Sequence, residues 1–328
     1  MLRYVGRRIL VAIPTLIVVS MVSFIIIQIP PGDFLTAYVA RLRATNEEVN
    51  ADEIAVLTEQ YGLNQPIYVQ YYKWVSGIVT RGDFGRSMEW KTSVKSVIWE
   101  RLGLTVVLTG ATLLFTWALA IPIGILSATK QYSIFDYLAT FFGFIGLGIP
   151  NFLFALVLMW IAYAYFGQSV GGLFSAEYLE EPWSWAKVWD MIKHLWIPMI
   201  VVGMRGTASL IRTMRANLLD ELHKPYVMTA RAKGVSETRL LLKYPVRVAL
   251  NPFLSTVGWA LPQLISGATI VSVVLSLPMA GPLLLRALQS QDMYLAGSFV
   301  LLLSTLTILG TLISDVLLAW ADPRIRFE

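Results

Sequence analysis

Long apolar stretches recur along this chain, and they constrain its fold more than any other feature. The stretches 9–29, 102–128, 137–166 and 251–275 carry no charge, and 296–320 contains only Asp315. A weaker stretch begins near 195 and meets Arg205 after ten residues. Because a helix needs roughly 20 apolar residues to cross a bilayer, we expect an all-α polytopic membrane protein with six transmembrane helices. The 137–166 stretch is longer than necessary, so we expect it to be tilted or kinked.

Composition and motifs argue against an enzyme. The chain is 56% hydrophobic and only 14% charged, against roughly 25% in soluble proteins. It has no cysteine, and His194 and His223 lack the spacing of metal ligands. There is no phosphate-binding loop and no convergent set of catalytic side chains. We therefore expect no catalytic residue, no metal, no cofactor bound by this chain and no nucleic-acid partner, which leaves a conduit or a scaffold.

The basic residues predict an orientation. Arg3, Arg7 and Arg8 precede the first apolar stretch without an acid among them. The positive-inside rule therefore places both termini in the cytoplasm if six helices cross the membrane. The expected parts are listed here: a cytoplasmic N-terminus and first helix at 1–29, an external helical lobe at 30–101, a transmembrane core at 102–320 with a cytoplasmic loop at 205–250, and a cytoplasmic tail at 321–328.

The expected external segments carry helix and aromatic signals. Within the lobe, the spacing of apolar residues predicts a helix that stops at Gly62 and a second helix that starts at Pro66. Trp183, Trp185, Trp189 and Trp196 cluster before and at the start of the fourth stretch. We interpret them as an interfacial aromatic belt, and a small folded cap with tryptophans in its own core is the alternative.

A polar, basic block separates the fourth and fifth stretches. Pro225 at a helix start and Gly234 just past its end predict a short helix of about ten residues, followed by a second helix over 236–248. Three interpretations stay open for this block: a surface that touches anionic lipid, a solvated loop, or a docking element for a cytoplasmic partner. The glycine stop favours docking, because attraction to lipid needs no such defined end.

The same block resembles a known family. "YVMTARAKGVSETRLLLKYPVRVALNP" is similar to the EAA loop of ABC importer permeases in the dipeptide/oligopeptide branch, with "TARAKG" as its strongest part. Further similar stretches are "RRIL", "YGLNQPIYVQYYKWV", "GDFGRS" and "DPRIRF", which run in order through nearly the whole chain. Met228 and Thr229 depart from the pattern, since Glu and Ala stand there in the family.

The resemblance implies a type I ABC importer permease fold and a set of partners. These are a homologous second permease subunit, two cytoplasmic ATPases that use ATP and Mg, an external substrate-binding protein and membrane lipid, in a bacterial inner membrane. It also implies a coupling helix that contacts the ATPase through Tyr226, Thr229, Ala230, Arg231, Lys233 and Gly234. The expected solute is a small peptide, with an oligosaccharide or a nickel chelate as the alternative.

Polar residues inside the spans are candidates for the pathway. Gln263, Ser266 and Thr269 share one face of the expected fifth helix, and Asn151 follows a Gly-Ile-Pro kink. Hydrogen bonding between helices is the alternative role for all four.

An acid inside the membrane is functional by default, so Asp315 is the remaining candidate. We favour a structural pairing of Asp315 with Arg212 or Arg215. An ion-coupled secondary transporter that uses Asp315 is the runner-up function, and a membrane anchor for a larger assembly is another.

Overall fold

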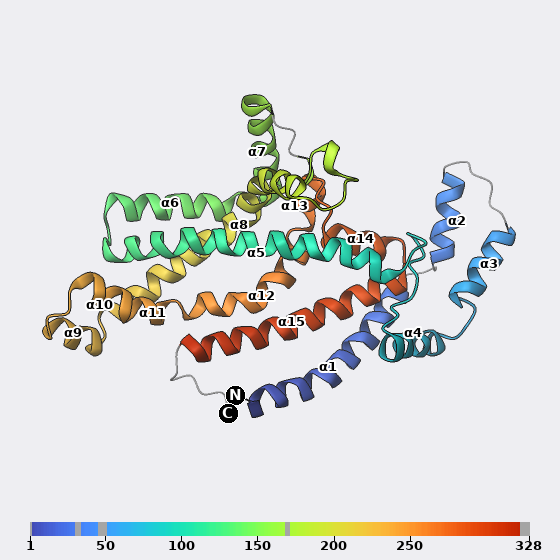
Figure 1. The fold of residues 1–328 in the computed structure, drawn as a ribbon, viewed down its shortest axis with the longest axis horizontal. Coiled ribbons are helices and arrows are strands. Elements are labelled where there is room, and N and C mark those ends of the chain that lie inside the picture. Colours follow the sequence, from blue (N-terminus) through green and yellow to red (C-terminus); the bar gives the residue numbers. More distant parts are fainter. Residues whose placement is uncertain (1, 30–33, 45–50, 168–170, 322–328) are drawn as a thin grey trace. The chain divides into compact units, whose positions relative to one another are not determined.

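The computed structural model describes residues 2–29, 34–44, 51–167 and 171–321, and the expected tail at 322–328 lies outside them. The helices are α1 Leu2–Gln28, α2 Phe34–Ala44, α3 Ala51–Tyr61, α4 Ile67–Arg81, α5 Val94–Thr129, α6 Ile134–Gly148, α7 Asn151–Phe166, α8 Trp185–Leu222, α9 Pro225–Ala232, α10 Glu237–Lys243, α11 Pro245–Ala249, α12 Asn251–Gly267, α13 Thr269–Val274, α14 Ala280–Gln289 and α15 Met293–Ala321 (Figure 1). The described residues form no β-strand, only an isolated bridge between Arg86 and Ser93, so the all-α prediction is confirmed.

The chain divides into two compact units, which are described separately. Unit 1 comprises Met1–Tyr4, Thr105–Pro278 and Leu309–Glu328. Unit 2 comprises Val5–Leu104 and Met279–Ile308. Three long helices, α1, α5 and α15, contribute residues to both units.

Four helices in the described part of the chain are long and apolar enough to cross a membrane: α1, α5, α8 and α15. The bent pair α6 and α7 makes a fifth if it counts as one span. The expected fourth span extends further than the sequence indicated, since α8 runs unbroken from Trp185 to Leu222. The count of six spans stays a prediction.

The expected kink in the third stretch is confirmed, and it is sharp. Helices α6 and α7 meet at an angle of 105°. Ile149 adopts an extended conformation between them, as the residue before a proline prefers, and Pro150 caps α7. The glycines of this stretch therefore precede a helix break, and Gly146 also packs closely on Met204 of α8.

Helix α8 is the centre of unit 1. It packs against α6, α7, α11, α12 and α13. Ile211, Met214 and Leu218 of α8 are buried together with residues of α5, α11 and α12. At Gly124 of α5 the two helices approach so closely that a Cβ atom would lie 2.6 Å from the Cβ of Met214. A glycine is required there because any side chain would push α8 away.

The fifth expected stretch is not one continuous helix. It consists of α12, with 17 residues, and α13, with 6 residues, which are separated at Ala268. The prediction that Gln263, Ser266 and Thr269 share one helical face is therefore wrong for Thr269, which begins α13, whereas Gln263 and Ser266 both belong to α12.

The basic block after α8 folds into α9, α10 and α11, which gather near the end of α8 (Figure 1). The predicted start at Pro225 is confirmed, and α9 has eight residues. Gly234 has a φ of 78°, and the N–H groups of Gly234 and Val235 donate to the carbonyl oxygens of Arg231 and Ala230. This is a Schellman cap, which accounts for the glycine at this position.

The second expected helix of this block, over 236–248, is divided in two. Helix α10 ends before Tyr244, and α11 begins at Pro245. Proline cannot donate a hydrogen bond into the preceding turn, so one continuous helix is excluded.

In unit 2, the predicted helix stop at Gly62 and the start after Pro66 are confirmed. A buried carboxylate in this unit, that of Asp292, was not predicted to have a structural role. Asp292 is fully buried, and its carboxylate accepts hydrogen bonds from the Ser87 hydroxyl and from the backbone N–H groups of Met88, Glu89 and Leu295. Burial raises the pKa of the Asp292 carboxyl. The residue thus ties the end of the 30–101 segment to the start of α15.

Candidate functional site

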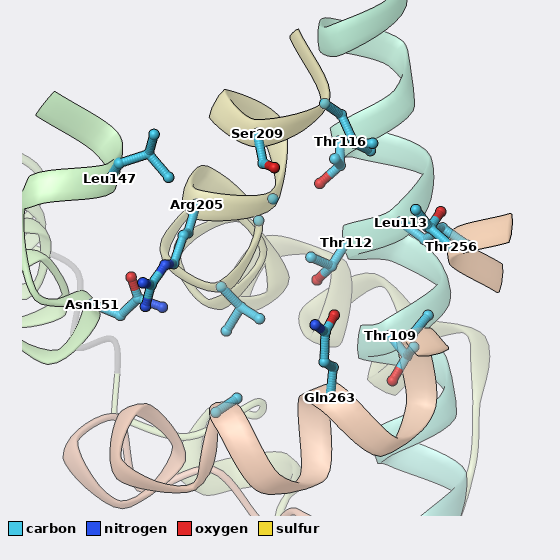
Figure 2. Close-up of a pocket in the computed structure, with 16 residues that line it drawn as sticks. Thr109, Thr112, Leu113, Thr116, Leu147, Asn151, Arg205, Ser209, Thr256 and Gln263 are labelled. Atoms are coloured by element: carbon cyan, nitrogen blue, oxygen red, sulfur yellow. The ribbon is translucent and has the colours of Figure 1, made fainter. Parts of the chain in front are cut away.

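A cavity of about 630 Å³, lined by both polar and apolar residues, lies among the helices of unit 1 (Figure 2). The residues that line it come from α5, α6, α7, α8 and α12, and the polar ones are Thr109, Thr112, Thr116, Asn151, Arg205, Ser209, Thr256 and Gln263. The size is that of an ordinary ligand site, for which roughly 300–1,000 Å³ is typical. Hydroxyl and amide groups dominate the polar lining, so the cavity suits a solute that donates and accepts hydrogen bonds.

Arg205 is the only charged residue among the 16 that line this cavity. Figure 2 shows its side chain extending from α8 toward Asn151. It forms no ion pair or hydrogen bond with any residue of the described ranges. The sequence placed Arg205 at the start of a cytoplasmic loop, but the structure places it in the middle of α8, within a candidate span.

Two of the four expected pathway residues, Asn151 and Gln263, line the cavity. The side chain of Ser266 lies outside the described residues. Thr269 starts α13 and is not part of the lining. The threonines of α5 were missed, although Thr105, Thr109, Thr112 and Thr116 recur every three or four residues and so mark one polar face of that apolar helix.

The surface of α9 presents most of the expected coupling residues. Met228, Thr229, Arg231 and Lys233 are exposed. Ala230 is instead buried with Val227 and Leu240, and these three hold α9 against α10. The hydroxyl of Tyr226 donates to Glu221, near the end of α8. The exposed face is therefore carried by a small, tightly packed unit.

Arg231 is engaged within the chain. Its Nε donates to Oε1 of Glu237 at 2.6 Å, and its Nη2 donates to Oε2 at 3.0 Å. Because this hydrogen-bonded pair favours both charged forms, the pKa of Glu237 is lowered and that of Arg231 is raised. Lys233, by contrast, has no ion-pair partner among the described residues.

A partly buried ion pair joins α6 to α8 between the cavity and the basic block. Arg215 Nε and Nη2 each donate to one oxygen of Asp136, both at 2.8 Å. Ser127 and the N–H of Tyr132 also donate to this carboxylate, which is almost fully buried. The predicted pairing of Asp315 with Arg212 or Arg215 is therefore wrong: Arg215 binds Asp136, and Arg212 lies over the ring of Phe144.

Asp315 has a different contact. The hydroxyl of Tyr4 donates to its Oδ2 at 2.6 Å and so links the start of α1 to α15 within unit 1. Among the described residues there is no group of three or more histidine and acidic side chains that would hold a metal ion.

Of the four tryptophans expected at an interface, Trp183 precedes α8, and Trp185, Trp189 and Trp196 lie on it. Trp183, Trp185 and Trp189 are all exposed, and Trp185 is exposed to 91%. Trp196 is only partly exposed, and the ring of Trp183 contacts the buried Phe174, so the interfacial belt stays a prediction.

Comparison with known proteins gives matches over nearly the whole chain. The family described as "binding-protein-dependent transport system inner membrane component" matches residues 120–327, and its N-terminal companion matches residues 1–109.

Full-length relatives agree with the family match. The chain is 36% identical to the oligopeptide transport system permease protein AppB of Bacillus subtilis, with all of both chains covered. It is 32% identical to the dipeptide transport system permease protein DppB of Alkalihalophilus pseudofirmus and 32% identical to the oligopeptide transport system permease protein OppB of Haemophilus influenzae, each again over the full length of both chains. The chain therefore belongs to the binding-protein-dependent transport system inner membrane component family, as an integral inner-membrane permease subunit of an ABC importer whose ATP is hydrolysed by separate subunits.

Proposed function

We propose that this chain forms half of the translocation pathway for a short peptide, which an external binding protein delivers. The relatives named as oligopeptide and dipeptide permeases support the solute class. A homologous second permease subunit supplies the other half of the pathway. The cavity of unit 1 is the part of the pathway that this chain contributes, through polar residues such as Asn151 and Gln263.

Helix α8 carries this proposal, because it belongs to both regions that an importer must connect. Arg205 and Ser209 of α8 line the cavity, and the same unbroken helix ends at Leu222, three residues before α9 begins. From Arg205 to Leu222 the helix extends roughly 25 Å. A movement of α9 on an ATPase is therefore transmitted to the cavity through the continuous helix α8.

In this scheme α9 is the coupling helix and sits in a groove of the ATPase. Thr229, Arg231 and Lys233 present its polar contacts, Tyr226 and Ala230 hold it against α8 and α10, and Gly234 sets the direction in which the chain leaves it. Both termini and the basic block of α9, α10 and α11 face the cytoplasm, and 30–101 faces the binding protein. ATP drives transport, and Asp315 has a structural role at the contact with Tyr4.

The test is uptake of a labelled dipeptide into proteoliposomes that hold the complete transporter, with and without ATP. We expect Gly234→Pro and Arg231→Glu to abolish uptake while ATP hydrolysis and the membrane level of the chain persist. Gly167→Pro is the matched control, since Gly167 also has a positive φ, of 60°, at a helix end with open space around it. Normal uptake in both α9 variants removes the coupling role, and uptake without ATP removes the proposed function.

A further inference from the structure

The positive charge of Arg205 in the cavity has no acidic partner among the described residues. None of the 16 lining residues is acidic. Two other arginines on α8 are engaged within the chain: Arg215 binds Asp136, and Arg212 lies over the ring of Phe144. A charged side chain within a membrane span is costly to maintain, and such residues mark ion or substrate pathways.

We propose that Arg205 binds a carboxylate of the transported solute, so that the pathway selects for solutes with a free carboxyl group. This inference rests on the proposed function and deepens it. A guanidinium presents a planar fork of donors that matches a carboxylate, and such charge-assisted hydrogen bonds are among the strongest in proteins.

The rest of the lining fits the remainder of such a solute. Asn151 lies beside Arg205 in Figure 2, and Gln263 and Thr112 extend into the same space from α12 and α5. Amide and hydroxyl groups both donate and accept, so they pair with peptide groups whatever the side chains. The cavity thus combines one fixed charge with sequence-tolerant contacts, as a pathway for varied peptides requires.

A carboxylate for Arg205 has a second possible source, an acid on the partner permease. The two sources differ in one measurable property. A solute carboxylate makes transport depend on the charge at the end of the peptide, whereas a carboxylate of the partner affects all solutes alike.

The experiment compares ATP-driven uptake of radiolabelled dialanine and of dialanine amide by the complete reconstituted transporter. Both probes are supplied at concentrations that saturate the binding protein. The readout is the ratio of the two uptake rates in a variant divided by the same ratio in the wild type. This double ratio cancels any preference of the binding protein, because that protein is unchanged.

We expect Arg205→Gln to reduce the preference for the free carboxylate by about tenfold or more, because a hydrogen bond between charged groups is lost. Arg205→Lys keeps the positive charge but loses the paired donors of the guanidinium. We therefore expect an intermediate reduction of the preference for the free carboxylate. Arg212→Gln is the matched control: it removes the same charge two turns further along α8, over the ring of Phe144, and we expect an unchanged ratio.

The results distinguish a failure of the proposed function from a failure of the role of Arg205. If the wild type takes up neither probe with ATP, the proposed function fails. If the wild type transports, and Arg205→Gln and Arg205→Lys both keep the wild-type ratio, the role of Arg205 fails while the proposed function stands. An equal loss for both probes assigns the cation to the partner permease and also overturns the inference. If Arg205→Gln does not reach the membrane, the uptake ratio of Arg205→Lys is used instead. A reduced ratio then supports the role of Arg205, and a wild-type ratio overturns it.

Discussion

In the cavity of unit 1, Arg205 has no partner among the described residues, whereas in the basic block Arg231 is held by both oxygens of Glu237. The cavity is built from side chains of five helices, and its cation faces open space. The block is built from three short helices, and its cation closes a contact within the chain. The difference fits the proposal that the cavity charge serves a ligand, while the block uses part of its charge to fix its own shape.

This contrast changes the expected contact with the ATPase. Arg231 is available to an acid of the ATPase only if its contact with Glu237 opens or is shared. Lys233 and the exposed side chains of Met228 and Thr229 are accessible without such a change. The departures from the family pattern at Met228 and Thr229 thus lie on the exposed face, which we propose as the docking surface, and not in the packing of α9.

The largest effect is expected at the ion pair that lies between the two regions on α8. Asp136→Ala leaves Arg215 without its buried partner, and breaking such a pair costs about 3 kcal/mol of unfolding free energy. The unfolding midpoint of the purified complex measures it, and Glu180→Ala is the control at an exposed acid.

The double variant Asp136→Ala with Arg215→Met tests the cause. Removing both charges relieves the unpaired arginine, so we expect it to recover most of the loss. If the double variant is as unstable as Asp136→Ala alone, the loss of stability comes from lost packing and not from the unpaired charge of Arg215.

A smaller effect is expected where α5 and α8 touch. In Gly124→Val, the new side chain meets Met214 and displaces α8, at a cost of about 1–3 kcal/mol. Uptake should fall further than stability indicates, because α8 connects both regions. Gly110→Ala in the same helix meets nothing within 4 Å, and we expect normal stability and uptake. Equal behaviour of the two variants would contradict the close contact.

The smallest effect concerns the exposed pair in the block. The contact with Arg231 lowers the pKa of Glu237, so its stabilising contribution is present above the ordinary pKa and is lost only as pH falls through the lowered one. We therefore expect the uptake per ATP of the wild type, relative to Glu237→Gln, to stay constant between pH 7 and pH 5. A decline over this range that Glu237→Gln does not share would show that the carboxylate protonates at a higher pH.

Local sequence signals predicted some parts of this site and not others. Pro225 and Gly234 act on neighbouring backbone, so the limits of α9 could be read from the chain. The position of Arg205 could not, because a cation at the end of a span and a cation beside a cavity interrupt an apolar stretch in the same way. The pair Asp136 and Arg215 joins residues 79 positions apart, which no local pattern reports. The 105° bend was signalled only as a kink, since a proline marks a break without giving its angle.

Labelling of a single thiol tests the central claim most directly. The natural chain has no cysteine, so Ser209→Cys places a unique thiol in the cavity, and Thr129→Cys places one at an exposed position at the end of α5. The account predicts that a bulky thiol reagent abolishes ATP-driven dipeptide uptake for the Ser209 variant and not for the Thr129 variant. It also predicts that excess dipeptide, supplied during turnover, slows the labelling at position 209. Full uptake after complete labelling at position 209 would contradict a pathway through this cavity.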